Sequence, residues 1–295
     1  MASLKEVRNR IVSVSSTQQI TSAMKMVSAA KLRRAQNAIT QMRPYASKLK
    51  EILENLSSSI ETSAENPYSR QSPVKNVLLV AINSNRGLCG AFNANVIKQA
   101  TKLSREQYAG CNVSVLAIGK KANDFFTKSK YNVVDPGMPK KLHELYDDLS
   151  FVNVTQVAEI VMRLFVEGQY DRVDLIYNQF KNAAVQVLTT EQFLPVKPIE
   201  TTGEAKPLST DYTFEPSKEF IIQELIPKSL KIQFFKALLD SHAAEHGARM
   251  TAMHKATDNA ADLIKELKLS YNKARQASIT NEILEIVGGA EALSS

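Results

Sequence analysis

The sequence predicts an α/β protein in which two long terminal helices form an antiparallel coiled coil and carry an inserted Rossmann-like α/β domain. Three observations predict this fold. Apolar residues recur with a heptad period over residues 3–60. Short β-rich segments alternate with helical ones between residues 76 and 196. The last eighty residues return to a helical pattern in which alanine recurs at every fourth position.

The first helix is predicted from a single stripe of apolar side chains. Counting alternately by three and four from Leu4 to Ile60 gives seventeen positions, of which thirteen are apolar. This 3.5-residue period indicates a left-handed supercoil against a partner helix. Pro44 lies inside the stripe, and we expect a kink there rather than an end, because the stripe continues through Ala46 and Leu49.

Four consecutive positions of this stripe are polar, within the segment QQITSAMKMVSAAKLRRAQ at residues 18–36. They are Gln18, Thr21, Lys25 and Ser28. One explanation is that the seam rotates, with the apolar contacts moving to Ile20, Met24, Val27 and Ala30/Lys31, so that one face is left for other proteins. The alternative is a polar layer that sets the register of the coiled coil.

The middle of the chain predicts a mostly parallel sheet with a hairpin at its end. The strand candidates are residues 76–82, 112–119, 173–180 and 184–196, and the helix candidates are 91–107, 120–129 and 153–168. Ser, Pro and Asn mark residues 61–75 as a linker, and prolines mark 195–210 as the exit from the domain.

The C-terminal helix is predicted to pair closely with another helix. Pro216 and Pro227 punctuate its beginning, and a row of small residues follows, formed by Ala244, Ala248, Ala252, Ala256 and Ala260. Such a row is a ridge without bulk, which lets a second helix approach. We therefore expect an N-terminal shaft helix at 1–62, an α/β domain at 74–210 and a C-terminal shaft helix at 217–295. Two helices alone bury little surface, so other chains must surround them.

Charge is concentrated at the N-terminus. The whole chain has a formal net charge of +7, whereas residues 1–50 hold ten Lys or Arg against one acid, and the remaining 245 residues sum to −2. A basic helix of this kind needs an anionic partner, either nucleic acid, a lipid surface or an acidic protein loop. A basic coiled-coil nucleic-acid-binding or scaffold protein is therefore an alternative, although it does not explain the alanine row or the α/β insert.

Metal and nucleotide sites have weak support. The segment HAAEH places His242, Glu245 and His246 at a zinc-binding spacing, but a third ligand would have to come from elsewhere, and we expect a solvated helix face. The segment INSNRGLCGAFNANVIKQA (82–100) joins a strand to a helix through glycines, yet it matches neither nucleotide-binding motif. Gly87 and Gly90 equally suit a turn that presents Arg86 and Cys89 outward. We predict no catalytic residue, cofactor or metal.

Three segments together resemble the γ subunit of F-type ATP synthases. They are KEVRNRIVSVSSTQQITSAMKMVSAAKLRRAQ (5–36), SNRGLCGAFN (84–93) and ARMTAMHKATDNA with YNKARQASITNEILEIVGGAEAL (248–293). Asn85 and Ala91 depart from this family, which usually has Asp and Gly there, and so does His254-Lys255, where the family often has Lys and a small residue.

The resemblance implies a central rotor shaft that couples rotation of a membrane c-ring to conformational change in catalytic β subunits. The implied partners are the α and β subunits, the ε subunit and the c-ring, and the chain itself is not an enzyme. The coupling ion is a proton or sodium. The heptad stripe runs far past any cleavable targeting segment, so we expect the mature protein to start near Met1. These features favour a bacterial protein, peripheral on the cytoplasmic face of the inner membrane.

The resemblance also implies a set of partner-contact residues. Met24 is expected to contact a partner subunit, and Lys25, Lys31, Arg33 and Arg34 are expected to meet an acidic loop of the β subunits. In the loop of the α/β domain near the lower rim of the ring we expect Arg86 and Cys89. On the C-terminal helix, the residues that match positions hydrogen-bonded to β-subunit loops are Arg275, Gln276 and Thr280. The nearly uncharged end IVGGAEALSS would lie in a hydrophobic collar at the top of the ring.

Overall fold

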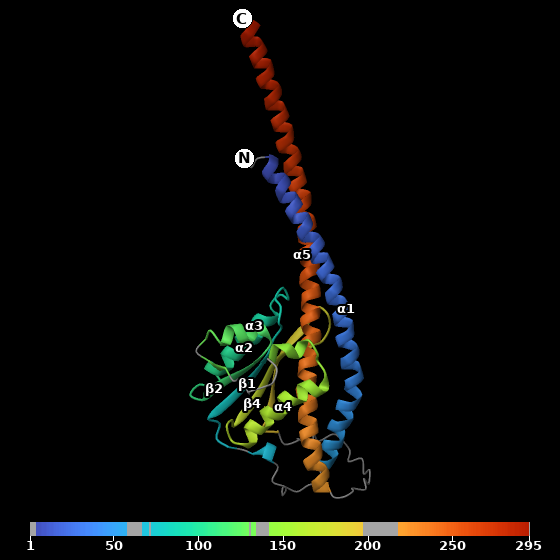
Figure 1. Ribbon diagram of the computed structural model, residues 1–295, viewed down its shortest axis with the longest axis vertical. Coiled ribbons are helices and arrows are strands. Elements are labelled where there is room, and N and C mark those ends of the chain that lie inside the picture. The colour runs from blue at the N-terminus through green and yellow to red at the C-terminus, as the bar shows by residue number, and fades with distance from the viewer. Residues whose placement is uncertain are drawn as a thin grey trace. The chain divides into compact units, whose positions relative to one another are not determined.

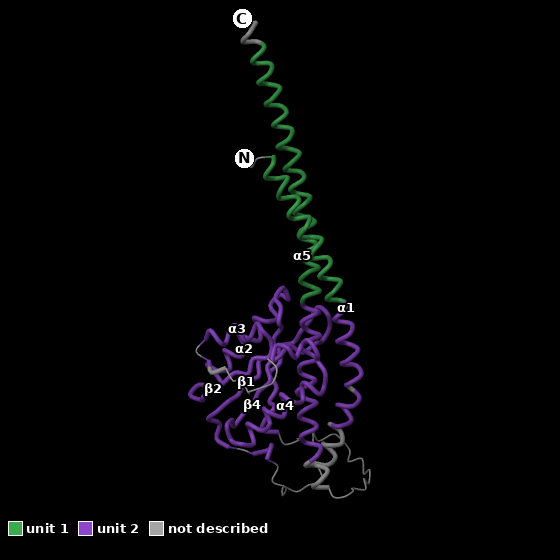
Figure 2. Tube along the Cα trace, viewed as in Figure 1, with its two compact units in different colours: residues 1–29, 249–295 green, residues 30–248 purple. Residues whose placement is uncertain are grey.

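The computed structural model describes residues 4–57, 67–70, 72–129, 131–133, 142–196 and 218–294. It divides into two compact units, shown in Figure 2: residues 1–29 with 249–295, and residues 30–248. Helix α1 runs over Leu4–Ser57 and α5 over Lys218–Ser294, so both contribute to each unit. Parts of three predicted segments lie outside the described residues. They are residues 58–62 of the first shaft helix, residues 61–66 and 71 of the linker, and residues 197–210 of the exit, and Pro216 lies outside as well.

A five-stranded sheet forms the centre of the larger unit (Figure 1). Its strands are β1 Asn76–Ile82, β2 Asn112–Ile118, β3 Asn132–Val133, β4 Arg172–Phe180 and β5 Gln186–Leu194. The order is β3-β2-β1-β4-β5, with parallel pairs except for the antiparallel β4–β5 hairpin. The predicted central sheet is therefore confirmed. Strand β3 was not predicted, because two residues are too few to show a period.

Helices cover both faces of this sheet. On one face α2 (Phe92–Arg105) and α3 (Lys120–Phe126) pack through Val96, Ala100 and Phe126. On the other face lie α4 (Phe151–Val166) and residues 230–238 of α5. Because both faces are covered, β1 reads as the continuous apolar run NVLLVAI rather than as an alternation. Two short 3-10 helices complete the unit, Pro67–Ser69 and Leu142–Tyr146.

In the larger unit, α1 buries the positions of the heptad stripe. Leu32, Ala35, Ile39 and Leu49 of α1 are buried, as the heptad stripe predicts. The helix does not end at Pro44, and α5 likewise contains Pro227. The α1 side chains that follow the stripe beyond Leu49 are outside the described side chains.

In the smaller unit the first part of α1 and the last part of α5 lie side by side and run in opposite directions (Figure 1). The direction follows from two cross-helix contacts, because Thr21 meets Thr257 whereas Lys25, one turn later, meets His254, earlier in α5. The predicted antiparallel pairing of the terminal helices is thereby confirmed.

The polar segment of α1 does not rotate the seam. Thr21 and Ser28 are buried at 8% and 3% exposure, whereas Ile20 and Val27 are 60% and 58% exposed. The predicted shift of the apolar contacts to Ile20 and Val27 is therefore wrong. The heptad register continues unchanged, and it is filled here by small polar side chains whose hydroxyls can be satisfied inside the interface.

The polar layer satisfies its own hydrogen bonds. Thr257 Oγ1 lies 2.9 Å from Thr21 Oγ1 across the interface, and Ser28 Oγ donates to the carbonyl of Met24 at 2.8 Å. The Lys25 Nζ lies 3.5 Å from His254 Nδ1, which is also 3.3 Å from a carboxylate oxygen of Asp258. The predicted alternative, a polar layer in the coiled coil, fits this geometry.

Candidate partner-binding surfaces

The last part of α5 exposes apolar side chains that no other part of the described chain covers. Ile279, Ile283 and Val287 follow one another at every fourth position, and they are 44%, 54% and 55% exposed. Leu284 and Ile286 beside them are 63% and 72% exposed. The described part of α1 begins at Leu4, and α5 continues past it (Figure 1). Contiguous exposed apolar side chains on a helix indicate a surface that another chain covers.

The three predicted contact residues on α5 lie on this same stretch. Arg275, Gln276 and Thr280 are exposed. The Thr280 hydroxyl donates to the Gln276 carbonyl at 2.9 Å, so the helix itself satisfies it. Arg275 makes no hydrogen bond or ion pair with another described residue. A guanidinium offers five donors in a planar fork, so this side chain is available to a carboxylate or carbonyl group of another chain.

The predicted contact residues of α1 form two groups. Met24 and Lys25 are half-buried in the smaller unit, where Lys25 approaches His254. Lys31, Arg33 and Arg34 belong to the larger unit and are exposed, with no ion pair to another described residue.

Within the smaller unit, Lys25 of α1 and Arg275 of α5 do not lie at one site. Lys25 lies opposite His254 of α5, because its Nζ is 3.5 Å from His254 Nδ1. A helix rises about 1.5 Å per residue, so Arg275 lies roughly 30 Å farther along. The surfaces are separate contact zones along a helix pair.

Exposed apolar residues on α1 were not among the predicted contacts. Val12, Ile20, Met26 and Val27 are 58% to 66% exposed. They lie off the heptad stripe, and that position is the signal in the sequence that would have found them.

The loop from Ser84 to Asn93 presents Arg86 outward but not Cys89. Arg86 is exposed, and Leu88 is 64% exposed in a left-handed conformation with φ 62°. Cys89 is 1% exposed, so the predicted outward presentation of this thiol is wrong. The thiol is buried because it packs against Phe92 and against Ala244 of α5, so any effect of Cys89 on a partner is indirect.

A polar network holds this loop in place. Ser84 Oγ donates to the Arg86 carbonyl at 2.6 Å and accepts from Asn93 Nδ2 at 2.9 Å. The Ser84 backbone N–H donates to Asn93 Oδ1 at 3.0 Å. Asn93 Nδ2 also lies 3.2 Å from Cys89 Sγ.

Asn85 links this loop to two neighbouring segments. Its Oδ1 accepts from the backbone N–H of Lys120 at the start of α3 at 3.0 Å, and its Nδ2 donates to the His143 carbonyl at 2.7 Å. An aspartate, which is usual here in the resembled family, is acceptor-only when ionised and could not make the second bond. Asn85 therefore has a structural role of its own in this chain.

The edge of the sheet where a doubly wound fold usually binds ligands is filled by α5. Ala244 packs with Cys89 and Phe92 next to the loop. A Cβ atom on Gly247 would come within 3.2 Å of the Ala183 carbonyl oxygen, so the absence of a side chain permits this contact. The crevice beyond the carboxyl ends of parallel strands is the default ligand site of such folds, and here a helix occupies it.

His242, Glu245 and His246 do not form a solvated helix face. Glu245 and His246 are 7% and 5% exposed, and the prediction of a solvated face is wrong because the larger unit packs around this part of α5. The two imidazoles lie with their Nε2 atoms 3.1 Å apart, and Tyr146 stacks on His242 with ring centroids 5.9 Å apart. Burial of Tyr146, followed by the charge of Glu245, raises the pKa of its hydroxyl well above the usual value. Across the described part of the chain, no three metal-binding side chains converge.

Among the described residues, no helix is long and apolar enough to cross a membrane.

Comparisons with known proteins identify the relatives of this chain. A family model described as ATP synthase matches residues 3–293. The ATP synthase gamma chain of Flavobacterium psychrophilum is 61% identical over 294 residues, which is 99% of both chains. That of Flavobacterium johnsoniae is 60% identical over the whole of both chains. These relatives do not support the alternative of a basic nucleic-acid-binding or scaffold protein.

Solved structures with a similar fold come from two mitochondrial assemblies. A chain of the central stalk and c-ring of the Tetrahymena thermophila ATP synthase is 25% identical with a TM-score of 0.54, covering 80% of this chain and 99% of that one. A chain of the OSCP/F1/c-ring part of the Euglena gracilis ATP synthase is 22% identical with a TM-score of 0.64, covering 98% of this chain and 94% of that one.

Proposed function

This chain belongs to the ATP synthase family, as one of its gamma chains, and on that premise we propose how it works as the central shaft of an F-type ATP synthase. It is a non-catalytic subunit, because catalysis in this complex lies in the β subunits. The shaft turns inside a ring of α and β subunits and couples rotation of the membrane c-ring to conformational change at the catalytic sites. The coupling ion is a proton or sodium.

The exposed apolar end of α5 is the observation that carries this proposal. A helix with Ile279, Ile283 and Val287 in water would be a liability for a protein that acts alone. A surrounding ring removes this surface from water at every rotational position. The side chains of residues 280–290 are all exposed, so the surrounding subunits contact more than one side of the helix.

Coupling follows from the asymmetry of a helix pair. Such a pair cannot present the same face to three equivalent catalytic sites at once, so each β subunit meets a different surface. The surface that a site meets biases its open or closed state, and by linkage nucleotide binding at that site exerts torque on the shaft. Moving a site from mostly open to mostly closed takes about 5.5 kcal/mol of differential interaction.

Charged contacts are suited to supply part of this energy. We assign Met24 to a contact with a partner subunit, and to contacts with an acidic loop of the β subunits we assign Lys25, Lys31, Arg33 and Arg34. The exposure of the last three supports this role, since an unpaired cation attracts a carboxylate at little cost in desolvation. Arg275, Gln276 and Thr280 would meet β-subunit loops farther along α5. Arg86 would contact the lower rim of the ring, and the buried Cys89 would hold the loop that carries it.

The division of labour along the chain is part of the same proposal. Residues 1–62 and 217–295 act as the shaft, and the α/β domain at 74–210 carries the ε subunit and rests on the c-ring. The chain is then a peripheral protein on the cytoplasmic face of a bacterial inner membrane. The end IVGGAEALSS lies in a hydrophobic collar formed by the ring.

Reconstitution tests the proposal. The purified chain is mixed with its cognate α and β subunits, and complex size and Mg-ATPase activity are measured. We expect an inactive chain that drives formation of a large, active complex. A chain that never joins such a complex would contradict the proposal.

A variant pair makes this test specific to the shaft. Ile283→Asp with Val287→Asp places two charges on the exposed end of α5, where they cost the isolated chain little stability. Because a carboxylate is costly to bury without a partner, we expect complex assembly or ATPase activity to fall at least about tenfold. The matched control is Val152→Asp on α4, which is 66% exposed in the α/β domain and should leave both unchanged.

A further inference from the structure

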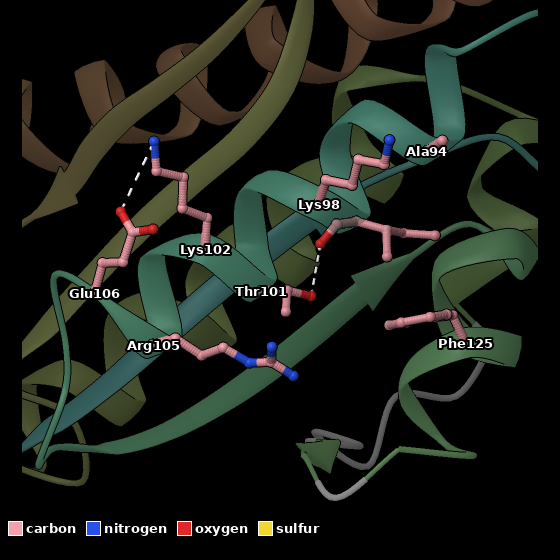
Figure 3. Close-up of a pocket in the computed structure, with 8 residues that line it drawn as sticks. Ala94, Lys98, Thr101, Lys102, Arg105, Glu106 and Phe125 are labelled. Atoms are coloured by element: carbon pink, nitrogen blue, oxygen red, sulfur yellow. Dashed lines mark hydrogen bonds and ion pairs between the residues drawn. The ribbon is translucent and has the colours of Figure 1, made fainter.

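A groove on the α/β domain has no role in the function proposed above. It lies between α2 and α3 and has a volume of about 600 Å³. Figure 3 shows its lining side chains, with most of them coming from the outward face of α2 and Phe125 facing them from α3. The lining residues are Ala94, Ile97, Lys98, Thr101, Lys102, Arg105, Glu106 and Phe125.

The floor of the groove is apolar. Ile97 and Ala94 contribute aliphatic surface, and the Phe125 ring is 42% exposed although it also packs edge-on against Phe126, with ring centroids 5.2 Å apart. The Thr101 hydroxyl donates to the Ile97 carbonyl at 2.8 Å, so its own helix satisfies this group. An exposed aromatic ring beside aliphatic side chains gains free energy when an apolar partner covers it.

Three cations line the groove. Lys98, Lys102 and Arg105 stand at successive turns of α2, with the Lys98 and Lys102 side chains extending to one side of the helix and the Arg105 side chain to the other (Figure 3). Glu106, the one acid among the lining residues, lies 3.8 Å from Lys102. Lys98 and Arg105 make no hydrogen bond or ion pair with another described residue. The groove therefore keeps two unpaired cations, at backbone positions about 10 Å apart by the rise of the helix.

The groove is built on elements that the core holds. The opposite side of α2 is buried against the sheet through Val96, Ala100 and Leu103, and α3 is anchored by Ala122 and Phe126. A surface on two anchored helices is preorganised, so a ligand orders few side chains when it binds.

We propose that this groove binds an acidic amphipathic helix of another protein chain. Carboxylates at positions i, i+4 and i+7 of such a helix have the same spacing as Lys98, Lys102 and Arg105, and apolar side chains on its adjoining face cover Phe125 and Ile97. A free inorganic anion would leave the apolar floor uncovered. A helix laid along a groove between two helices uses both the charge and the floor.

The first experiment measures binding of a synthetic peptide to the full chain. The probe is a labelled helical peptide with Glu at i, i+4 and i+7 and Leu on the adjoining face, and fluorescence anisotropy reports its affinity. A scrambled peptide of the same composition is the control for non-specific attraction by a chain of net charge +7. We expect tighter binding of the amphipathic peptide, which weakens as salt rises.

Variants assign the binding to the groove. Lys98→Glu with Arg105→Glu should weaken binding by about tenfold or more, and Phe125→Ala by several-fold. Lys181→Glu, an exposed charge reversal in the turn between β4 and β5, is the matched control and should change the affinity less than about twofold. Equal affinity for the scrambled peptide, or loss of binding in the control but not in the groove variants, would overturn the proposal.

A second measurement places the groove in the assembled complex. A carbodiimide joins a lysine amine to a carboxylate in contact with it, and mass spectrometry then identifies the joined peptides. We expect Lys98 coupled to a carboxylate on an amphipathic helix of another chain. If instead anionic phosphatidylglycerol vesicles bind the chain through Lys98 and Arg105 while the peptide does not, the occupant is a lipid surface and the proposal fails. Either outcome is independent of the reconstitution test, because the groove variants leave the shaft helices intact.

Discussion

At the scale of single residues, Asp171 shows how one side chain joins two distant segments. Its carboxylate accepts hydrogen bonds from the backbone N–H groups of Lys75 and Asn76, both at 2.9 Å, and from Ser72 Oγ at 3.0 Å. It thereby ties the start of β1 to the start of β4. Burial raises the pKa of Asp171, but these hydrogen bonds and the charge of Arg70 together lower it below its usual value.

This arrangement predicts a pH-dependent contribution to stability. A carboxyl whose pKa is lower in the folded state stabilises the fold above its unfolded pKa of about 3.9, and the contribution is lost as pH falls through the folded value. Asp171→Asn should therefore lower the free energy of unfolding by about 1 kcal/mol at pH 7, after allowance for its partial exposure. Urea unfolding at pH 7 and pH 3 measures this, and the deficit should shrink at pH 3.

The control for this prediction is Asp147→Asn, because Asp147 is exposed and its carboxylate makes no hydrogen bond or ion pair with another described residue. It should leave stability unchanged at both pH values. A deficit for Asp171→Asn that stays constant between pH 7 and pH 3 would show that the charge of Asp171 contributes nothing.

At the scale of elements, the helix pair of the smaller unit combines an apolar stripe with a polar layer. The layer is centred on Thr21 and Thr257, whose Oγ1 atoms lie 2.9 Å apart. Thr257 Oγ1 is also 2.8 Å from the Met253 carbonyl, so it has a second acceptor within its own helix. Satisfied polar groups of this kind specify register at little gain in stability.

A double-mutant cycle tests the Thr21–Thr257 contact. Thr21→Val and Thr257→Val should each lower the free energy of unfolding by about 0.5–1 kcal/mol, because each leaves its partner with one hydrogen bond fewer. The double variant should cost less than the sum, since both polar groups are then gone. Thermal unfolding of the four proteins measures the coupling.

The control is Thr40→Val, because the exposed Thr40 hydroxyl donates only to the Gln36 carbonyl of its own helix, at 2.9 Å. Strictly additive changes for Thr21→Val and Thr257→Val would argue against the contact between them.

At the scale of the whole molecule, the described residues leave exposed a set of apolar and cationic side chains that we expect other subunits to cover. The exposed apolar side chains of α5 are not covered by other described residues, and Lys31, Arg33 and Arg34 of α1 make no ion pair with another described residue. Stability of the chain and function of the complex therefore depend on different residues. A substitution on the exposed part of α5 should change coupling without changing the stability of the chain.

Arg275 is the best residue for testing whether function of the complex can change without a change in stability of the chain. Arg275→Ala should lower ATP-driven proton or sodium pumping and the torque of the assembled complex several-fold, while the melting temperature of the isolated chain stays within about 1 °C. Arg275→Lys retains the charge but not the planar fork, and it should restore coupling only in part. Unchanged pumping in Arg275→Ala would remove the proposed contact with the β subunits.

The sequence alone was sufficient to predict the elements in which apolar residues follow a regular pattern. The heptad stripe of α1 and the apolar runs of β1, β2 and β4 predicted those elements closely. The reason is that a buried helix or strand needs apolar residues at the positions that face the core, and the geometry of the element fixes their spacing. The family was also readable from the sequence, since its specific segments lie near both ends and in the middle. The exposed apolar residues Ile20 and Val27 of α1 were predicted wrongly, because they were assigned to a rotated seam rather than to the outer surface.

Only the tertiary structure decided the features that depend on distant neighbours. The polar positions Thr21 and Ser28 stay in the seam because Thr257 of α5 donates a hydrogen bond to Thr21 and because both side chains are buried, which periodicity within α1 does not reveal. Cys89 and His246 are buried because α5 returns across the edge of the sheet more than 150 residues after the loop begins. Whether a polar side chain is buried depends on the residues that pack against it, and these can be distant in the sequence. The sequence determined the periodic elements and the family, and the packing of the two chain ends decided which polar groups are enclosed.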